Sequence, residues 1–462
     1  MTSLAIYTSF YITYTTPSIE ENGVRGDVMK LVLIGGGSFV FAPTVLEDAI
    51  VKHRLAGQLV LVDPNEEAVE AMAGAGRRIA RELGVQLEVI GVTDRLSALP
   101  GADYVIVSAS PQGAYRWKID YDILSRHGMA DQARECGGLG GMMNAFRSIT
   151  LLLEVCKDME ALCPDAVLLD VTNPMPRVVT AIERYTNIRS AGFCSIAHRG
   201  PNGYDLLPRL LNRKPEHLNI VTAGLNHFAW VRAIKDKRTG EDLLFKLSEM
   251  VASGDWQGFD GETVRELGVM RRWLHEYGAV AAGHVDHHAE YLPPQAGVRY
   301  TTSPPYHGTE ADRARRLREL QCIAAGEGDW NSMFDHGSWE HPVDVALALH
   351  AGTSLKVDIL NTRNGDAIPQ LPGDRIVEVP VMLAGGRITP EPVPPFPDKL
   401  ASLLRVLSDV HERVAEAAVK GDMKLAREAI GLDPAIVDKE RAYAAFNHML
   451  EAHADLLPQF AR

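Results

Sequence analysis

The stretch MKLVLIGGGSFVFAPTVLEDAIVKH, at residues 29–53, runs from a short apolar segment through three glycines into a helical pattern of apolar residues. The apolar segment predicts a β-strand, and the spacing after the glycines predicts an α-helix. Gly35, Gly36 and Gly37 form the turn between them, where absent side chains let a backbone approach a pyrophosphate. Val40 replaces the third glycine of the G-x-G-x-x-G pattern, so a turn without any ligand remains the alternative.

Apolar, β-branched segments continue to alternate with helical patterns beyond this turn. They are QLVLVD ending at Asp63, QLEVIGVT, ADYVIVSAS, AVLLDVTNP and IRSAGFCS. This alternation predicts an α/β fold, a Rossmann-type doubly wound parallel sheet with right-handed crossovers. Asp63 stands at the end of the second segment, where a carboxylate can accept hydrogen bonds from both ribose hydroxyls of a dinucleotide. Asp63 therefore favours NAD over NADP.

The regular alternation fades after about residue 200, where strand and helix patterns mix. We expect a disordered extension at residues 1–28 and an NAD-binding Rossmann domain at residues 29–200. Residues 201–462 are expected to form a mixed α+β domain that holds substrate and metal contacts and the oligomer interface.

Charge and cysteine content limit the class of protein. The chain has 47 basic and 60 acidic side chains, a formal net charge of −13, which disfavours nucleic acids and anionic membranes as partners. Its apolar runs are too short to predict a membrane span. Five scattered cysteines, an odd number, argue against a disulfide framework and for a reducing compartment, so we expect a cytoplasmic protein.

Three polar segments follow later strands and are candidates for a ligand site. They are Val171-Thr172-Asn173-Pro174, Gly192-Phe193-Cys194 and Gly224-Leu225-Asn226-His227. Ligands of doubly wound folds collect at the carboxyl ends of strands, so these segments are expected to converge. Cys194 and His227 offer a thiolate and an imidazole, an incomplete metal shell that leaves room for substrate oxygens and water. Each residue taken singly could instead be an inert core side chain.

In their order and spacing, these segments resemble glycoside hydrolase family 4, the NAD-dependent exception to the two-carboxylate mechanism. The matching residues run along nearly the whole chain from Met29. They are Gly35, Gly37, Ser38 and Phe41; Asp120, Ile123, Arg126, His127 and Gly128; Gly138, Gly140 and Gly141; Thr172, Asn173 and Pro174; Cys194; His227; Ala289, Glu290 and Tyr291; and LPGDRIVEVP from Leu371.

The resemblance implies a lactate or malate dehydrogenase-like fold and a set of site residues. Cys194 and His227 would bind Mn²⁺ or a similar divalent cation. We assign cofactor contacts to Gly35, Gly37, Ser38, Phe39 and Asp63, and substrate contacts to Asn173, Asp120, Arg116 and Asn226. The family further suggests a homodimer or homotetramer.

The resemblance also implies hydrolysis of a hexopyranoside by transient oxidation. NAD would take hydride from C3, and the cation would polarise the new carbonyl and acidify the C2 proton. A base would remove that proton, the aglycone would leave by elimination, water would add, and the hydride would return.

This chain departs from the family beside the metal cysteine, where Ser195 stands in place of His, Asp or Asn. A serine hydroxyl is a poor general acid, so His198 is the candidate replacement, with a surface histidine as the alternative. The base is expected in GHVDHHAEYLP, residues 283–293. Asp286 and Tyr291 are the candidates, although a phenol acts as a base only where a nearby metal lowers its pKa.

The sequence leaves more than one substrate and more than one reaction class open. The cations Arg116, Lys118, Arg126 and Arg199 leave open an anionic sugar substituent, such as a phosphate, carboxylate or sulfonate. A 2-hydroxyacid dehydrogenase shares the fold and would produce net NADH. A non-catalytic dinucleotide sensor is the second alternative.

Overall fold

A computed structural model describes residues 28–194, 206–303, 309–334 and 340–461. The predicted extension at residues 1–28 lies outside these ranges except for Val28.

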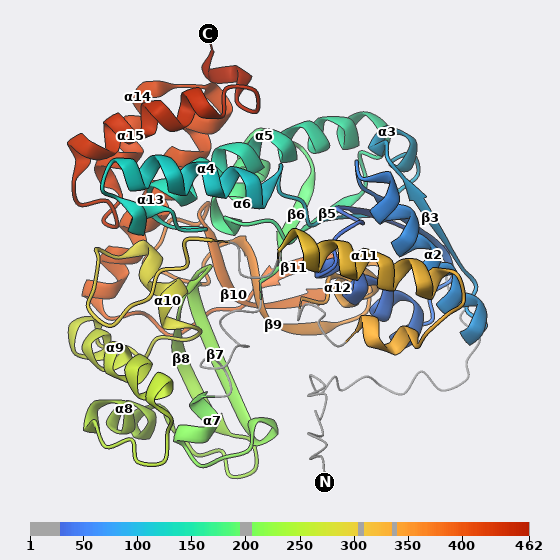
Figure 1. The fold of residues 1–462 in the computed structure, drawn as a ribbon. Helices are drawn as coiled ribbons and strands as arrows, with labels where there is room; N and C mark the ends of the chain where they lie inside the picture. Colours follow the sequence, from blue (N-terminus) through green and yellow to red (C-terminus); the bar gives the residue numbers. More distant parts are fainter. Residues whose placement is uncertain (1–27, 195–205, 304–308, 335–339, 462) are drawn as a thin grey trace.

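The first half of the chain forms a parallel sheet (Figure 1). Its strands are β1 (Met29–Ile34), β2 (Gly57–Val62), β3 (Leu87–Val92), β4 (Tyr104–Val107), β5 (Val167–Asp170) and β6 (Arg189–Gly192). Their order, β3-β2-β1-β4-β5-β6, is that of a dinucleotide-binding fold and confirms the predicted Rossmann sheet.

Helices cover both faces of this sheet. They are α1 (Phe41–Leu46), continued by the π-helical turn η1 (Glu47–Lys52), then α2 (Glu66–Leu83), α3 (Arg95–Ala98), α4 (Gly113–Arg126), α5 (Gly138–Leu162) and α6 (Met175–Tyr185). Leu31 and Leu33 of β1 belong to one apolar cluster, whereas Val32 and Ile34 belong to another. Alternate side chains of one strand thus pack into opposite layers, which explains why residues 31–34 are all apolar.

The second half extends the same sheet with antiparallel strands. β9 (Leu355–Arg363), β10 (Ile376–Ala384), β7 (Leu218–Leu225) and β8 (Phe228–Asp236) follow β6 in that order, and β11 (Arg387–Pro390) pairs with β10. The mixed C-terminal part was predicted. Its continuity with the parallel sheet, through β6 and β9, was not.

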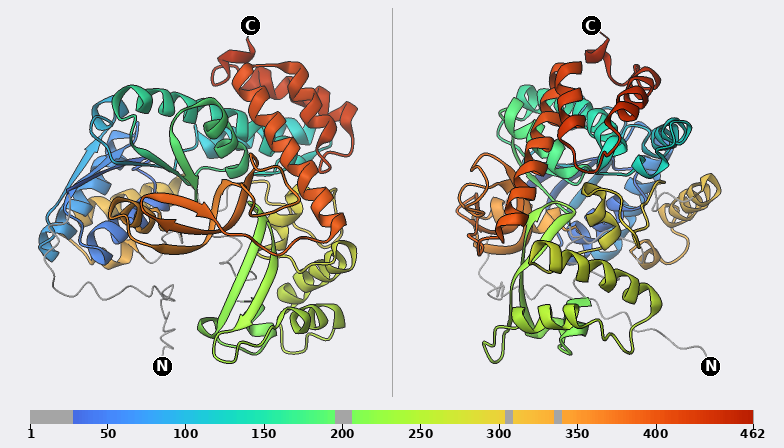
Figure 2. Two further views of the ribbon diagram at one scale, coloured as in Figure 1. Left: turned by 180° about the vertical axis from the view of Figure 1, so that it is seen from behind. Right: turned by 90° about the vertical axis from the view of Figure 1, so that its left-hand side faces the viewer.

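Several helices of the second half pack on helices of the first half, and others pack on strands of the second half. The helices of this half are α7 (Leu206–Leu210), α8 (Leu244–Ser253), α9 (Gly261–Tyr277), α10 (Val285–His288), α11 (Glu310–Ala324), α12 (Pro342–His350), α13 (Asp398–Lys420), α14 (Met423–Leu432) and α15 (Lys439–Ala452). α13 packs on α5 and α6, and α15 packs on α4, as both views in Figure 2 show. α11 lies along α2. The chain therefore crosses back over the Rossmann layers after residue 200. None of the helices in the described ranges is long and apolar enough to cross a membrane.

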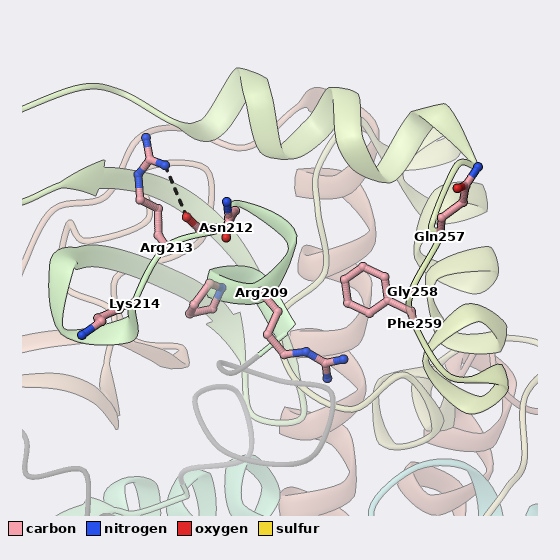
Figure 3. Close-up of a pocket in the computed structure, with 8 residues that line it drawn as sticks. Arg209, Asn212, Arg213, Lys214, Gln257, Gly258 and Phe259 are labelled. Carbon is pink, nitrogen blue, oxygen red and sulfur yellow. Dashed lines mark hydrogen bonds between the residues drawn. The ribbon is translucent and has the colours of Figure 1, made fainter.

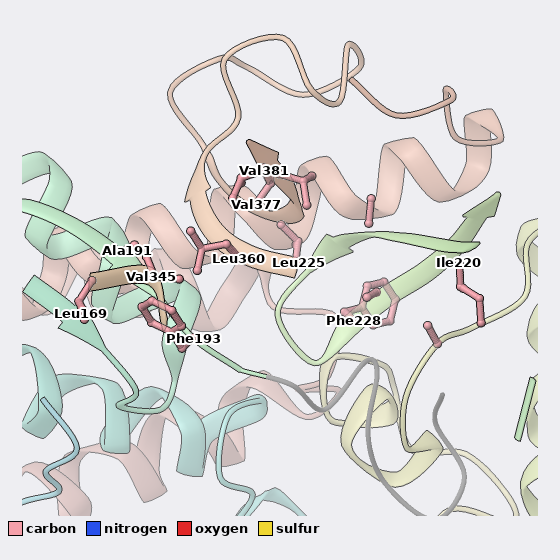
Figure 4. Packing of buried hydrophobic residues seen from close by; sticks show 14 of the residues in the cluster. Leu169, Ala191, Phe193, Ile220, Leu225, Phe228, Val345, Leu360, Val377 and Val381 are labelled. Atoms are coloured by element: carbon pink, nitrogen blue, oxygen red, sulfur yellow. The ribbon is translucent and has the colours of Figure 1, made fainter. Parts of the chain in front are cut away.

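One apolar core holds the strand ends that carry the candidate metal ligands (Figure 4). Phe193, which precedes Cys194, is buried in the same cluster as Leu225 and Phe228, which flank the turn containing His227. Burial of each such side chain stabilises the fold by roughly 1.5–3 kcal/mol. The core therefore fixes the backbone on both sides of the two ligands.

The glycine turn gives a stability prediction. Gly35 has φ +91°, and a Cβ there would overlap the carbonyl oxygen of Ser108, at the end of β4. Gly35→Ala should therefore lower the free energy of unfolding by roughly 2–4 kcal/mol, from the backbone strain and the clash together. Gly84→Ala is the matched control, because φ is +64° but nothing lies within 4 Å. Equal losses in urea melts of both variants would contradict the clash.

Candidate active site

The turn after β1 is held against the end of β2 by Asp63. The Gly37 amide donates to Asp63 Oδ2 at 3.1 Å, and the Asn65 amide donates to Oδ1 at 2.9 Å. A Cβ on Gly36 would lie 2.7 Å from Leu61 Cβ, and one on Gly37 would lie 2.9 Å from Asp63 Cγ. Only glycines allow the turn to approach the end of β2 this closely. The backbone of the turn thus stays free of side chains beside the point between β1 and β4 where the strand order reverses, which is where doubly wound folds bind dinucleotides.

Ser38 and Phe39 complete the predicted cofactor turn. Ser38 Oγ accepts hydrogen bonds from the amides of Val40 and Phe41, both at 3.3 Å, and so caps α1. Phe39 is half-buried beside it. The structure thus brings the predicted cofactor residues together, and their contacts to a dinucleotide stay a prediction.

Cys194 and His227, 33 residues apart in the chain, face each other. Cys194 Sγ lies 3.4 Å from His227 Nε2. His227 lies in the two-residue turn between β7 and β8 and has φ +61°, which is unusual for a residue with a side chain. Burial lowers the pKa of its imidazole to about 3, and neighbouring His287 acts in the same direction. The ring is therefore neutral, the form that binds metals.

The donor pair fits a divalent cation. Two ligands that share one Zn²⁺ ion, with metal–sulfur and metal–nitrogen bonds of about 2.3 and 2.1 Å, lie roughly 3.6 Å apart in tetrahedral geometry. The observed 3.4 Å separation is close to this value. A thiolate and an imidazole are fewer than the four protein ligands of a structural site, so the pair suits a catalytic ion.

Asp286 takes part in a different cluster. Glu266, His284 and Asp286 present ligand-type atoms to one another. Arg265, however, donates to both Asp286 oxygens at 2.8 Å, and the Arg299 amide donates to Oδ1 at 2.8 Å. A carboxylate held by a bidentate arginine is a poor base, so this placement disfavours the role that the sequence suggested for Asp286.

Tyr291, the other candidate base, is buried. Its ring packs against Phe228 and His411, with centroid separations of 6.1 and 5.7 Å. Its hydroxyl has no hydrogen-bond partner within the described residues. Burial, assisted by the Cys136 thiol, raises the pKa of the phenol well above its ordinary value. The base role of Tyr291 stays a prediction.

Sequence reasoning missed Glu135, which lies beside Asn173. The Asn173 side-chain amide donates to Glu135 Oε1 at 3.2 Å, and Asn173 Oδ1 has no partner in the described part of the chain. Burial raises the pKa of the Glu135 carboxyl. Its position just before the Gly138-x-Gly140-Gly141 motif was the available signal.

His287 and Glu290 form a second pair that sequence reasoning did not select. Glu290 Oε2 accepts the amides of Cys136 at 2.8 Å and Gly137 at 3.0 Å, and Oε1 lies 3.6 Å from His287 Nδ1. The His287 and His227 rings are 5.2 Å apart. Burial opposes protonation of His287, but the Glu290 carboxylate outweighs it and raises the imidazole pKa. The segment at residues 283–293 thus contributes this pair beside His227.

The structure does not support substrate contacts for Asp120 and Arg116. Asp120 accepts from Arg147 at 2.8 Å and lies 2.7 Å from His453 Nε2. Arg116 donates to Asp455 at 2.9 Å. These contacts join α4 to the C-terminal helices, because α15 returns over α4. The sequence motif marked Asp120 as notable but could not indicate these partners.

Asn226 also differs from its expected role. Its side chain is fully buried, and its amide donates to Glu378 Oε2 at 2.6 Å. The group that was expected to bind substrate is therefore engaged inside the sheet.

The proposed cations and acid fall in two groups. Lys118 pairs with Asp122 at 2.6 Å, and Arg126 donates to the Asp122 carbonyl at 3.2 Å, so both are engaged on the surface of α4. Ser195, His198 and Arg199 lie outside the described residues.

A hollow of about 440 Å³ is lined by none of the predicted site residues that the structure describes (Figure 3). It is lined by Pro208, Arg209, Asn212, Arg213, Lys214, Gln257, Gly258 and Phe259. Arg209 stacks on Phe259 at 4.9 Å, and Arg213 and Lys214 point in different directions. The cations do not converge, so this hollow lacks the geometry of an anion site.

Comparison with known sequences decides the family. The family 4 glycosyl hydrolase profile matches residues 30–200, and the profile of the family 4 C-terminal domain matches residues 222–436. The chain belongs to glycosyl hydrolase family 4. This confirms the resemblance found in the sequence and does not favour the dehydrogenase alternative.

Relatives of this family 4 enzyme act on different sugars. An alpha-galactosidase of Bacillus subtilis is 27% identical over 451 residues, which cover 93% of this chain and 99% of that protein. An alpha-galacturonidase of the same organism is 25% identical and covers 92% and 97%. The family alone therefore leaves the sugar open.

Solved structures agree on the fold. A 6-phospho-alpha-glucosidase from gut microorganisms, in complex with NAD and Mn²⁺, has a TM-score of 0.75 at 24% identity, covering 94% of this chain and 99% of that one. Malate dehydrogenase of Plasmodium falciparum has a TM-score of 0.51 at 13% identity, covering 85% and 100%. The predicted dehydrogenase-like fold is thereby confirmed.

Proposed function

We propose that this family 4 glycosidase uses NAD and Mn²⁺ to hydrolyse a small hexopyranoside with an anionic substituent. The observation that carries the proposal is the 3.4 Å approach of Cys194 Sγ to His227 Nε2 at the edge of a Rossmann sheet. The NAD and Mn²⁺ bound to the similar phosphoglucosidase support the cofactors. That enzyme and the galacturonidase, whose names imply charged sugars, support the anionic substituent.

The cofactors would be held by separate parts of the site. The turn from Gly35 to Ser38 and the Asp63 carboxylate would hold NAD, and Cys194 with His227 would hold the cation. When bound, NAD provides reversible hydride transfer, and a divalent cation stabilises negative charge that develops on a sugar oxygen.

The chain's own residues would orient the sugar beside this pair. Asn173 Oδ1, which has no partner among the described residues, can accept a hydrogen bond from a sugar hydroxyl, and Glu135 fixes the amide of the same side chain. Glu290, held by two backbone amides, keeps His287 against the His227 ring. Tyr291 is the candidate base and His198 the candidate acid. We also infer a cytoplasmic homodimer or homotetramer, which the scattered free cysteines and the family resemblance support.

A glycoside panel tests the proposal. Nitrophenyl glycosides with neutral, 6-phosphorylated, uronic and sulfonated sugars are assayed with and without NAD and Mn²⁺, while NADH is monitored. We expect release of nitrophenol from an anionic member only with both cofactors, and loss of activity after chelation. Cleavage of neutral sugars alone would reject the anionic substrate, and net NADH without cleavage would indicate a dehydrogenase.

A further inference from the structure

A buried carboxyl group lies in the sheet between β6 and β7, the strands that precede the two candidate metal ligands. Glu378 of β10 is fully buried, and its Oε2 accepts hydrogen bonds from Asn226 Nδ2 at 2.6 Å and Asn361 Nδ2 at 3.2 Å. Both amides are fully buried as well. A buried acid is stable only where such donors replace water, so the three side chains depend on one another.

Strand register places Glu378 in one row of the sheet with the strands that precede Cys194 and His227. Glu378 pairs with Asn361 of β9, and Asn361 pairs with Gly192 of β6. On its other side Glu378 pairs with Gly224 of β7. One row of the sheet thus crosses β6, β9, β10 and β7, whose order is visible in Figure 1. Cys194 follows this row on β6 by two residues, and His227 follows it on β7 by three.

The turn that presents His227 needs such an anchor. His227 has φ +61°, a conformation that most residues avoid and that persists only when the surroundings enforce it. A Cβ on Gly224 would lie 2.5 Å from the Phe228 carbonyl oxygen, so the hairpin is tightly closed at its base. Asn226 directly precedes His227, and its side-chain amide donates to Glu378 Oε2 at 2.6 Å, the one side-chain hydrogen bond of Asn226 among the described residues.

We propose that Glu378 is a positioning residue for the metal site, acting through Asn226 to aim His227 Nε2 at Cys194 Sγ. The inference rests on the proposed metal-dependent function. It assigns no contact with substrate or cation to Glu378 itself. Groups that orient metal ligands from behind typically change metal affinity by about 10- to 100-fold when removed.

The test compares metal binding by the full-length wild type and by Glu378→Met, which keeps the side-chain length but removes the acceptor. We expect Mn²⁺ affinity to fall by about 10- to 100-fold in calorimetric titrations, with NAD affinity unchanged. In the Co²⁺-substituted protein, the thiolate-to-cobalt absorption band should shift or weaken. Glu378→Gln retains an acceptor oxygen and should recover most of the affinity.

Asn364→Ala is the matched control. Asn364 is also fully buried and donates to the carbonyls of Ile368 and Leu371, both at 3.0 Å, so its loss destabilises the protein outside this row. Its Mn²⁺ affinity and cobalt spectrum should match the wild type.

The outcomes separate the inference from the proposed function. If the wild type does not bind Mn²⁺, the proposed function fails. If the wild type binds but Glu378→Met binds equally well, or Asn364→Ala weakens binding as much, the role of Glu378 is overturned. Should Glu378→Met not fold, Asn226→Ala cuts the same link, and unchanged Mn²⁺ affinity in that variant would also overturn it.

Discussion

Replacement of Cys194 by serine should abolish glycosidase activity while leaving NAD binding intact. A serine hydroxyl stays protonated at neutral pH and is a much weaker ligand for a divalent cation than a thiolate. Loss of the several kcal/mol that a cation contributes to charge stabilisation corresponds to a fall in kcat on the order of 10³-fold. Steady-state kinetics at saturating NAD and Mn²⁺ measure this loss.

NAD affinity provides the internal comparison for Cys194→Ser. Cys194 follows β6, whereas the glycine turn and Asp63 lie at the ends of β1 and β2, and the Gly37–Asp63 hydrogen bond that closes this turn does not involve Cys194. Cys322→Ser is the control for loss of a thiol, because Cys322 is exposed on α11. A Cys194→Ser enzyme that keeps metal-stimulated turnover would remove Cys194 from the metal site.

The parallel sheet could be predicted because its signals are local. Each strand is a short apolar run, and the first ends in glycines that a neighbouring strand requires, as the approach of Gly36 to Leu61 shows. The antiparallel continuation through β9 depends on the pairing of Gly192 with Asn361, which are far apart in the chain. Nothing local to either residue specifies that partner. The return of α15 onto α4 was missed for the same reason.

Some site residues could likewise be predicted from the sequence, and others could not. The sequence indicated that Cys194 and His227 converge, because both follow predicted strands and ligands collect at strand ends. In the structure β7 runs antiparallel to β6, so the two residues meet without the shared carboxyl edge that this prediction assumed. It could not choose among neighbouring residues of α10, since successive residues of a helix point about 100° apart. Asp286 therefore meets Arg265, whereas His287 meets His227 and Glu290. Asp120 shows the complementary failure, since its partner His453 lies 333 residues away in the chain.

Replacement of Asp63 by alanine should cause a large loss of NAD affinity. The two oxygens of Asp63 close the glycine turn by accepting the amides of Gly37 and Asn65, and the carboxylate lies where the ribose of a bound dinucleotide is expected. Asp63→Ala should weaken NAD binding by about 10- to 100-fold, the equivalent of a charge-assisted hydrogen bond, without changing Mn²⁺ affinity. Fluorescence titration with NAD and calorimetry with Mn²⁺ measure the two affinities.

NADP distinguishes recognition by Asp63 from a mere loss of turn structure. If the carboxylate binds the ribose hydroxyls, it also repels a 2′-phosphate, so its removal should narrow the preference for NAD over NADP. If it only holds the turn, both dinucleotides should weaken in parallel, and Asp63→Asn, which keeps an acceptor for the Gly37 amide, should restore both. Unchanged NAD affinity in Asp63→Ala would remove Asp63 from the cofactor site altogether, because neither its charge nor its turn contacts would then contribute to binding.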